Sequence, residues 1–517
     1  MNQGLIPAKW AALTPSAQAV YDVPNDRRVS WADFDELVRR AANGLRSLGL
    51  LEGDRFAVLS RNCAEYQALY FAAGRAGVVL QPLNWRLAGP ELAAIVRDAA
   101  PKAVVSADEW SEEISQLQRE VDVPHWLQFG PKGDGSFEQL LDSSSAEEPV
   151  WADHVRDDDP LFILYTGGTT GQSKGAVHTH RSAAAGMLNQ TVAERIVPSD
   201  VYMLTGQMYH IPIVLAMNYM KHGCPLVLVN FEAKQALNII QAEKVSAFLG
   251  ITTMLNWMMA VPDFASYDLS SLRNIQYGGG PMPSSVVRSA LSSFPCTLIQ
   301  GYGQTEGTTM TFLSQEDHAR AVRGVDEQRL RSCGREGFIT SVRVVDEMGK
   351  EVPRDNKTPG QIIVKSEANM VGYLNRPDLT AETLRDGWMW TGDVATWDAD
   401  RYVFIVDRAK DMIISGGENI YSVQVEEAIN QHPAVLECAV IGIPDPEWGE
   451  AVKAVVVLKP GREATEAEII DVARTHLASY QKPRSVDFVS QLPKAPTGKI
   501  LKRDLRTPYW ADADRQV

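Results

Sequence analysis

The chain has 517 residues, of which 45% are hydrophobic and 22% charged, a balance typical of a globular enzyme rather than a disordered chain. This length exceeds one ordinary core, so we expect two or more domains. The formal net charge of −15 argues against general affinity for nucleic acid or for anionic membranes. Any anion-binding site must therefore be made locally.

The cysteines and the N-terminus indicate the compartment. The five cysteines lie far apart without a C-x-x-C pair, which predicts reduced thiols in a cytoplasmic protein rather than disulfides or zinc. The first residues lack the basic start and apolar stretch of a signal peptide. No run of about eighteen apolar residues occurs, so we expect no membrane span.

The first predicted elements alternate between helix and strand. Ser30 can cap a helix over 30–49, in which apolar residues recur at helical spacing up to Gly49. A strand at 55–59, a helix at 64–76 and a strand at 77–80 follow. This alternation predicts a parallel sheet with helices on both faces.

A loop rich in glycine and threonine follows an apolar strand at 161–164. Residues 165–175 combine glycines, which allow backbone N–H groups to approach an anion, with hydroxyls and Lys174. We expect a phosphate to bind here. No Gly-Lys pair occurs, which excludes a Walker A loop. Residues 171–175 match the G-x-S-x-G elbow of serine hydrolases, although Ser173 does not directly follow the strand. A surface loop without a ligand is a third interpretation.

The same alternation continues beyond this loop, and then the pattern changes twice. Helices are expected at 181–192 and 233–243, with strands at 225–229 and 245–249. Antiparallel strands at 340–345, 360–364 and 402–406 predict a β-rich subdomain. The last part predicts a compact α+β unit, with helices at 424–431 and 465–478 and strands at 435–443 and 452–458. We expect domains at 1–408 and 409–517.

Seven motifs in order carry a family resemblance over nearly the whole chain. They lie at 165–175, 278–281, 301–306, 391–393, 407–411, 415–420 and 493–499. The chain resembles the adenylate-forming superfamily, which includes acyl-CoA synthetases, non-ribosomal peptide adenylation domains and firefly luciferase. The resemblance implies an α/β fold: a large N-terminal domain of parallel α/β sheets with a β-rich subdomain, and a small mobile α+β C-terminal domain.

The resemblance also implies an ATP site. Attack of a carboxylate on the α-phosphate brings two anions together, so cations and N–H dipoles must neutralise them. Glu306 resembles the family's magnesium-binding residue, Thr305 a hydroxyl donor to the α-phosphate, and Tyr302 the residue stacked on adenine. Asp393 resembles the acceptor for both ribose hydroxyls, assisted by Arg408. The implied ATP contacts are Thr166, Gly168, Thr169, Thr170, Lys174, Gly278, Gly279, Gly280, Tyr302, Asp393 and Arg408.

Lys499 resembles the C-terminal lysine that bridges the attacking carboxylate and the α-phosphate, and is the third implied catalytic residue with Thr305 and Glu306. Lys410 matches the hinge about which the small domain rotates after adenylation. Lys502 and Arg503 fit solvated surface residues better.

The resemblance implies an acyl pocket and a coenzyme A site. His210 resembles the residue at the pocket mouth, although a buried core histidine is the competing interpretation. Gly303, Thr308 and Thr309 would line the pocket, and their small size leaves room for a bulky acid. Arg86 aligns with a coenzyme A phosphate contact, Gly417 would leave room for pantetheine, and Trp448 with Lys482 and Arg484 is a weaker candidate; a solvated basic rim is the alternative.

Four residues depart from the family pattern. Gly167 stands where Ser or Thr is usual, and Ser173 replaces the usual proline. Asp407 replaces a common glycine, and Ser422 stands where a proline is typical. None of these changes removes a group that the chemistry requires.

The leading hypothesis is an AMP-forming carboxylic acid–CoA ligase of the cytoplasm that uses ATP, Mg²⁺ and coenzyme A. Bacterial feruloyl-CoA and fatty acyl-CoA synthetases look most similar, and we expect an aromatic, phenylpropanoid-type or medium-chain acid. Alternatives are a fatty acyl-CoA synthetase, an enzyme that loads a carrier protein, a serine hydrolase using Ser173, and a silent homologue. No nucleic acid or integral membrane association is expected, and a homodimer is allowed.

Overall fold

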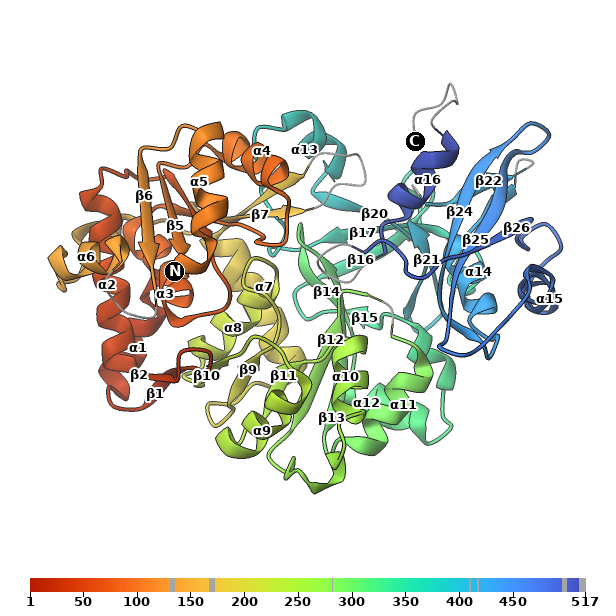
Figure 1. Cartoon of the computed structure of the whole chain (residues 1–517), viewed down its shortest axis with the longest axis horizontal. Helices are drawn as coiled ribbons and strands as arrows, with labels where there is room; N and C mark the ends of the chain where they lie inside the picture. The colour runs from red at the N-terminus through yellow and green to blue at the C-terminus, as the bar shows by residue number, and fades with distance from the viewer. Residues whose placement is uncertain are drawn as a thin grey trace. The chain divides into compact units, whose positions relative to one another are not determined.

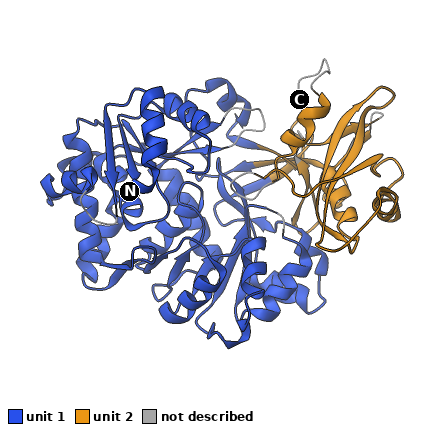
Figure 2. Cartoon of the chain, in the orientation of Figure 1, with its two compact units in different colours: residues 1–342, 364–390 blue, residues 343–363, 391–517 orange. Residues whose placement is uncertain are grey.

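The computed structural model describes residues 1–130, 135–166, 173–280, 282–408, 411–415, 418–494 and 500–510, without the side chains of Arg408 and Asn419. Packing divides the chain into two compact units (Figure 2). The larger unit comprises residues 1–342 and 364–390, and the smaller one 343–363 and 391–517.

The larger unit begins with a seven-stranded sheet of order β18-β8-β7-β4-β3-β5-β6. Its strands are β3 (Arg55–Leu59), β4 (Val79–Pro82), β5 (Ala103–Ala107), β6 (His125–Phe129), β7 (Pro160–Thr166), β8 (Lys174–Thr179) and β18 (Gly372–Tyr373). Strands β3 to β7 are parallel, whereas β8 and β18 add an antiparallel edge.

Helices cover both faces of this sheet, because alternate side chains of β3 enter different cores. Phe56 and Val58 pack in one core with α2 and α3, and Ala57 and Leu59 pack in another with α4 and α5. The helices of this region are α1 (Ile6–Leu13), α2 (Trp31–Ser47), α3 (Ala64–Ala76), α4 (Gly89–Ala99), α5 (Ser111–Glu120) and α6 (Ser136–Ser143). Ser30 caps α2 by accepting the N–H of Asp33, as predicted.

A nine-stranded sheet follows, of order β15-β14-β13-β12-β11-β9-β10-β1-β2. Its strands are β1 (Gln18–Asp22), β2 (Arg27–Ser30), β9 (Tyr202–Leu204), β10 (Leu226–Leu228), β11 (Ala247–Leu249), β12 (Asn274–Gly278), β13 (Thr297–Gln304), β14 (Thr308–Leu313) and β15 (Arg335–Glu336). Its helices are α7 (His180–Glu194), α8 (Pro212–Lys221), α9 (Ala233–Glu243), α10 (Thr252–Met259), α11 (Ser284–Ser293) and α12 (Gln315–Val322), seen around the sheet in Figure 1. Phe56 of β3 and Leu204 of β9 belong to one core, so the two sheets share their interior.

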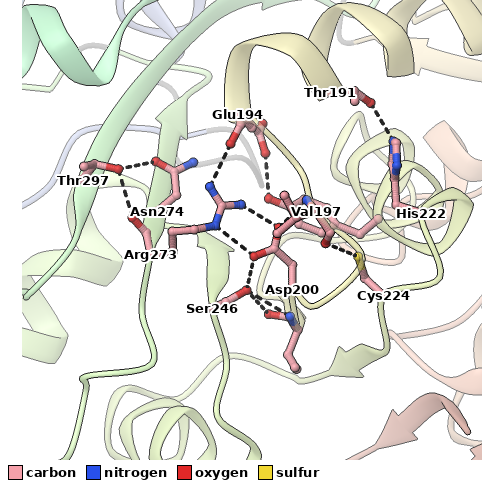
Figure 3. A network of polar contacts seen from close by, with 12 residues as sticks. Thr191, Glu194, Val197, Asp200, His222, Cys224, Ser246, Arg273, Asn274 and Thr297 are labelled. Carbon is pink, nitrogen blue, oxygen red and sulfur yellow. Dashed lines mark hydrogen bonds and ion pairs between the residues drawn. The ribbon is translucent and has the colours of Figure 1, made fainter.

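A partly buried polar network joins the amino ends of β9, β11 and β12 (Figure 3). Arg273 donates to Asp200 through Nη2 at 2.6 Å and Nε at 3.0 Å, and through Nη1 to the carbonyl of Glu194 at 3.0 Å. The hydroxyl of Ser246 also donates to Asp200, at 2.8 Å. The network fixes the amino ends of these strands. Ligands of α/β folds usually bind at the opposite, carboxyl ends of the strands.

The β-rich region forms a five-stranded sheet of order β16-β17-β20-β19, with β21 also paired to β20. Its strands are β16 (Ser341–Val345), β17 (Gly360–Lys365), β19 (Leu384–Arg385), β20 (Trp388–Trp397) and β21 (Val403–Arg408), and α13 (Pro377–Thr383) lies between β18 and β19 in the chain. The strand predicted at 402–406 is β21, and it pairs in antiparallel direction with β20, a strand that was not predicted.

The C-terminal part folds around a sheet of order β23-β22-β25-β24, with β26 on β25. Its strands are β22 (Ile413–Ser415), β23 (Glu418–Ile420), β24 (Val435–Asp445), β25 (Gly449–Leu458) and β26 (Ser485–Phe488), and its helices are α14 (Ser422–Ile429), α15 (Glu466–His476) and α16 (Lys502–Trp510). Val425 of α14 and Ile469 of α15 pack with Val440, whereas Leu505 of α16 packs with Ala439. Adjacent residues of β24 face opposite sides, so α16 covers the face opposite α14 and α15.

The α/β fold class is confirmed, and the predicted helices and strands are found with small shifts. Helix 30–49 is observed at 31–47 and helix 64–76 at the predicted bounds. The strand expected at 77–80 runs from Val79 to Pro82 because Gly77, at φ 67°, ends α3 in the left-handed conformation. Short 3₁₀ helices are η1 (Gln3–Leu5), η2 (Asp108–Trp110), η3 (Val150–His154), η4 (Phe264–Ser266) and η5 (Glu327–Arg331).

Candidate active site

The predicted phosphate loop connects two paired strands. Thr166 at the end of β7 lies opposite Lys174 at the start of β8 in antiparallel register. The ammonium of Lys174 lies 5.3 Å from the centroid of the Tyr373 ring. Gly168, Thr169 and Thr170 lie outside the described residues. The two described ends of the loop are therefore held together beside a cation.

Ser173 does not form a nucleophile elbow. Its hydroxyl donates to the carboxylate of Glu91 at 3.2 Å, and the strand β8 follows it directly. A hydrolase elbow requires a sharp turn from a strand into a helix, so this geometry does not support the hydrolase interpretation.

Glycines bring the backbones of β12 and β13 close together where adenine was expected. Gly278 pairs with Gly301, and a Cβ atom on Gly278 would lie 2.2 Å from the carbonyl oxygen of Gly301. Gly279 has φ 76°, which favours glycine, and a Cβ on Gly280 would meet no atom within 4 Å. Tyr302 follows Gly301 on β13. The predicted adenine contacts thus lie on neighbouring strands.

Thr305 and Glu306 lie in the turn between β13 and β14. The N–H of Gly307 donates to the carbonyl of Gln304 at 3.2 Å, which closes a β-turn. Thr308, the first residue of β14, follows this three-residue connection with φ 55°, in the left-handed region. A left-handed conformation is strained for a β-branched residue, so the surroundings must hold this turn in place.

Three contacts hold the turn. The Nε2 atom of His178 on β8 lies 2.7 Å from the carbonyl oxygen of Thr305. The N–H of Met370 donates to the carbonyl of Glu306 at 2.7 Å. The hydroxyl of Tyr373 on β18 donates to Oε1 of Glu306 at 2.7 Å. Strands at the edge of the seven-stranded sheet therefore anchor a turn of the nine-stranded sheet.

The donor set around Glu306 fits a magnesium ion shared with a nucleotide. No group of three or more His, Cys, Asp and Glu side chains that could hold a metal occurs within the described residues. Tyr373 occupies one carboxylate oxygen of Glu306 and no described residue donates to the other. Mg²⁺ is commonly bound by one or two carboxylates together with substrate phosphates.

The predicted acyl-pocket residues on the hairpin face helix α7. Thr308 is 4% exposed, and its Oγ1 has no hydrogen-bond partner within the described part of the chain. A Cβ atom on Gly186 of α7 would lie 2.9 Å from this oxygen. A Cβ on Gly303 would lie 1.8 Å from the carbonyl oxygen of Thr308, and Asn189 of α7 donates to the carbonyl of Thr309 at 2.8 Å. Small residues thus allow the helix and hairpin to approach.

His210 lies close to Arg86 rather than being an isolated core histidine. Burial and, to a smaller extent, the charge of the Arg86 guanidinium lower the pKa of His210 to about 4. Arg86 lies 4.7 Å from the ring centroid of Trp85, and the Tyr209 and His210 rings are 4.9 Å apart. The predicted pocket-mouth histidine and the predicted coenzyme A contact are therefore neighbours.

The predicted residues Asp393, Arg408 and Trp448 lie in the smaller unit. Asp393 on β20 is 4% exposed and pairs in register with Arg408 on β21, so the predicted ribose contacts are cross-strand neighbours in the backbone. Trp448 is 39% exposed, and the guanidinium of Arg484 lies 4.9 Å from its ring. Arg484 is one of the two basic residues, with Lys482, that were expected near Trp448.

Three further predicted residues lie outside the described part of the chain: Lys499, Lys410 and Gly417. The expectation that Lys502 is solvated is wrong. Its ammonium contacts Glu426 at 2.7 Å and the hydroxyl of Ser422, and its side chain is 13% exposed. Arg503 is 49% exposed, as expected.

Sequence reasoning did not identify His178, Tyr373 or Gly186. A glycine within a helix is a usable signal for Gly186, because it costs helix stability and so suggests close packing. His178 and Tyr373 lie in short strand segments, and their partners come from distant parts of the chain, so no local pattern reveals them.

Two family models match the chain. Residues 7–374 match the AMP-binding enzyme model, and residues 424–499 match the model of the AMP-binding enzyme C-terminal domain. The first match alone covers more than half of the chain.

Curated relatives align over nearly the full length. A feruloyl-CoA synthase of Amycolatopsis sp. is 36% identical over 513 residues, 98% of this chain and 99% of that protein. A long-chain-fatty-acid–CoA ligase of Mycobacterium tuberculosis is 35% identical over 99% of both chains. A fatty acid–[acyl-carrier-protein] ligase of Streptomyces coeruleorubidus is 32% identical over 95% of this chain and 93% of that protein.

A solved structure shares the whole fold. The ATP-bound crystal structure of MatB from Rhodopseudomonas palustris superposes with a TM-score of 0.87 and 29% identity, covering 100% of both chains. The chain belongs to the AMP-binding enzyme family, within the adenylate-forming superfamily. It is an AMP-forming acyl-CoA synthetase, for which ATP and coenzyme A are substrates. None of the helices in the described ranges is long and apolar enough to cross a membrane.

Proposed function

We propose that this acyl-CoA synthetase activates an aromatic, phenylpropanoid-type or medium-chain carboxylic acid. The observation that supports the acid class is the 36% identity with a feruloyl-CoA synthase over 98% of this chain. Gly186 of α7 and Thr308 of β14 pack closely together and form one wall of the proposed acyl pocket.

In the first proposed step, the acid carboxylate attacks the α-phosphorus of ATP and pyrophosphate leaves. The hydroxyl of Thr305 donates a hydrogen bond to the α-phosphate. Lys499 neutralises charge between the carboxylate and that phosphate. Lys174 and Thr166, with Gly168, Thr169 and Thr170, bind the phosphates. Tyr302 and residues 278–280 bind adenine, while Asp393 and Arg408 bind the ribose.

Glu306 is the proposed residue that holds Mg²⁺. The ion would neutralise charge on the phosphate oxygens. Glu306 and its hydrogen-bonded partner Tyr373 provide the protein side of this site, and the phosphates of ATP would complete it.

In the second proposed step, the thiol of coenzyme A attacks the acyl carbonyl carbon, and AMP leaves as the thioester forms. Domain alternation between these steps, with residues 1–408 and 409–517 as the moving parts and Lys410 as the hinge, would withdraw Lys499. Arg86, Gly417 and Trp448 are the proposed coenzyme A contacts. The proximity of Arg86 to His210 supports a coenzyme A position from which the pantetheine arm reaches the mouth of the acyl pocket.

Two alternative substrates remain within this chemistry. A longer fatty acid is supported by the 35% identity with a long-chain-fatty-acid–CoA ligase. A carrier-protein thiol in place of coenzyme A is supported by the fatty acid–carrier-protein ligase at 32% identity. We also propose a cytoplasmic enzyme, which fits five free cysteines, and a homodimer as the assembly to test.

Pyrophosphate release tests this proposal directly. Wild-type protein receives ATP and Mg²⁺ with ferulate, benzoate, octanoate or palmitate, each with and without coenzyme A, and products are identified by mass spectrometry. We expect release with ferulate or octanoate and a thioester only when coenzyme A is present. Preference for palmitate would move the substrate to the long-chain class. Release without thioester would support carrier loading, and no release with any acid would contradict the proposed acid class.

A further inference from the structure

The turn that carries Thr305 and Glu306 is held by residues of the strand that leaves the phosphate loop. Strand β8 carries Lys174 at its start and His178 four residues later. Strand β18 pairs with β8, with Tyr373 opposite Ala176. The phosphate-loop strand therefore contributes one contact to the turn itself and positions the strand that contributes a second.

His178 is a neutral hydrogen-bond donor to the turn. It is fully buried, and burial lowers its pKa to about 4. A carbonyl oxygen can only accept, so the Nε2 atom, 2.7 Å from the oxygen of Thr305, must carry the proton. The Nδ1 atom lies 3.2 Å from the hydroxyl of Ser182, which fixes the ring from its other side.

Tyr373 fixes the carboxylate of Glu306, the residue that follows Thr305 in the turn. Its hydroxyl donates to Oε1 of Glu306 at 2.7 Å, because a carboxylate oxygen can only accept. Backbone hydrogen bonds hold the strand of Tyr373 in register: Val371 donates to Val177 at 3.0 Å and Leu374 to Gly175 at 2.8 Å. The orientation of one oxygen of Glu306 is thus set by β8 through β18.

The arrangement couples two parts of the proposed phosphate site. Lys174 faces the ring of Tyr373 at 5.3 Å, while the hydroxyl of the same ring contacts Glu306. One tyrosine thus contacts a cation at the start of β8 on its face and an anion of the turn at its tip. The strained turn at Thr308, with φ 55°, needs such outside support.

We propose that His178 and Tyr373 are positioning residues for adenylation: His178 fixes Thr305 through its carbonyl group, and Tyr373 orients Glu306 so that one carboxylate oxygen is presented to a divalent cation. This inference rests on the proposed roles of Thr305 and Glu306. Loss of a partner that hydrogen-bonds a metal-ligating side chain typically costs about 10- to 100-fold in metal affinity or activity.

Tyr373→Phe removes one hydroxyl and keeps the ring beside Lys174. We expect the Mg²⁺ concentration for half-maximal adenylation to rise about tenfold, while the KM for the acid stays unchanged. Calorimetric titration with Mg·ATP, without any acid, should show about tenfold weaker binding. This binding measurement does not depend on turnover.

His178→Phe keeps a ring but removes both nitrogen contacts. We expect kcat for adenylation to fall about tenfold with little change in the KM for the acid, because one hydrogen bond that positions Thr305 is lost. His178→Gln offers an amide N–H near the position of Nε2, and it should recover much of this loss. Recovery by glutamine would not follow from a loss of core volume alone.

Matched variants separate positioning from stability. Tyr219→Phe removes a phenol–carboxyl hydrogen bond to Glu194, 2.9 Å long and fully buried. His180→Phe removes a buried histidine whose Nδ1 accepts the N–H of Gln3 at 3.0 Å. Both controls should lower the unfolding midpoint as much as the test variants do, but leave the Mg²⁺ dependence of adenylation unchanged.

The outcomes distinguish this inference from the proposed function. If wild type binds Mg·ATP and Tyr373→Phe and His178→Phe bind and react like wild type, the positioning roles are wrong. If Tyr373→Phe binds Mg·ATP more weakly but wild type accepts none of the acids, the positioning role stands and the proposed acid class fails. Equal changes in Mg²⁺ dependence in the control variants would also contradict the inference.

Discussion

The carboxylate of Asp407 accepts hydrogen bonds from both the backbone N–H and the hydroxyl of Ser422, the latter at 2.7 Å. Asp407 and Ser422 are two of the positions at which the sequence departs from its family pattern. A proline at position 422 would have no N–H to donate. The departures are therefore partners, and Lys502 extends the contact by reaching Ser422 and, at 2.7 Å, Glu426.

Substitutions of Ser422 test this partnership. Ser422→Ala keeps the N–H and loses the hydroxyl, so we expect the free energy of unfolding to fall by about 1 kcal/mol. Ser422→Pro loses both donors to a carboxylate that is 2% exposed, and the loss should reach about 3 kcal/mol. Proline is otherwise favoured at the first residue of a helix, which Ser422 is in α14. Urea unfolding measures both variants, and a proline variant as stable as wild type would contradict the account.

The sequence was informative where local patterns decide the structure. The helix capped by Ser30 and the strands near it could be predicted because their apolar spacing and caps are local. The contacts of Ser422 and Lys502 could not be predicted, because their partners lie elsewhere in the chain. A lysine after a glycine-rich turn is also more often solvated than buried. Residues that contact each other across sheets, such as His178 and Thr305, give no periodic signal.

The raised pKa of Glu194 predicts that the stability of the fold depends on pH. Its carboxyl group accepts hydrogen bonds from Tyr219, Gln190 and Gln276 beside the network of Figure 3, and burial raises its pKa from 4.5 to about 8 despite these bonds and the charge of Arg273. Between these pH values the folded chain keeps a proton that the unfolded chain releases. The stability contributed by Glu194 is therefore complete below pH 4.5 and is lost as pH rises towards 8.

Glu194→Gln removes this titration. We expect wild type to lose up to about 2 kcal/mol more unfolding free energy than the variant between pH 6 and pH 8. Urea unfolding at both pH values gives the difference. Parallel pH profiles for the two proteins would show that Glu194 does not titrate in this range.

Gly186→Ala tests the wall of the proposed acyl pocket. The new methyl group would lie 2.9 Å from Oγ1 of Thr308 and push this side chain towards the pocket. We expect the KM for ferulate to rise about tenfold while a small acid such as acetate is unaffected. Alanine is the better helix former by about 1 kcal/mol, so general unfolding is not the expected cause. An equal KM change for both acids would count against this wall.

Arg86→Ala tests the proposed coenzyme A contact. Loss of the guanidinium should raise the KM for coenzyme A about tenfold, as expected for a phosphate contact, and leave adenylation in the absence of coenzyme A unchanged. Arg97→Ala, which removes another exposed arginine paired with Glu120, serves as the control. A changed adenylation rate with an unchanged KM for coenzyme A would assign Arg86 to the acyl site instead.

The candidate site shows the same division between local and distant information. Glycines 278 to 280 and the Thr305–Glu306 turn could be identified because each motif is short and contiguous. The close approach of Arg86 to His210 joins segments more than one hundred residues apart, and only the folded chain brings them together. Thr308 was predicted as a lining residue, but its left-handed backbone and its contact with Gly186 were not.

The most direct measurement separates the two half-reactions in wild type, Lys499→Ala and the exposed control Lys459→Ala. Formation of the acyl-adenylate from ATP and acid is followed by mass spectrometry, and thioester formation is followed from a synthetic acyl-adenylate and coenzyme A. We expect Lys499→Ala to lose adenylate formation by at least about a hundredfold and to retain thioester formation, while Lys459→Ala keeps both. Unchanged adenylate formation in Lys499→Ala, or equal loss of both half-reactions, would contradict the central claim.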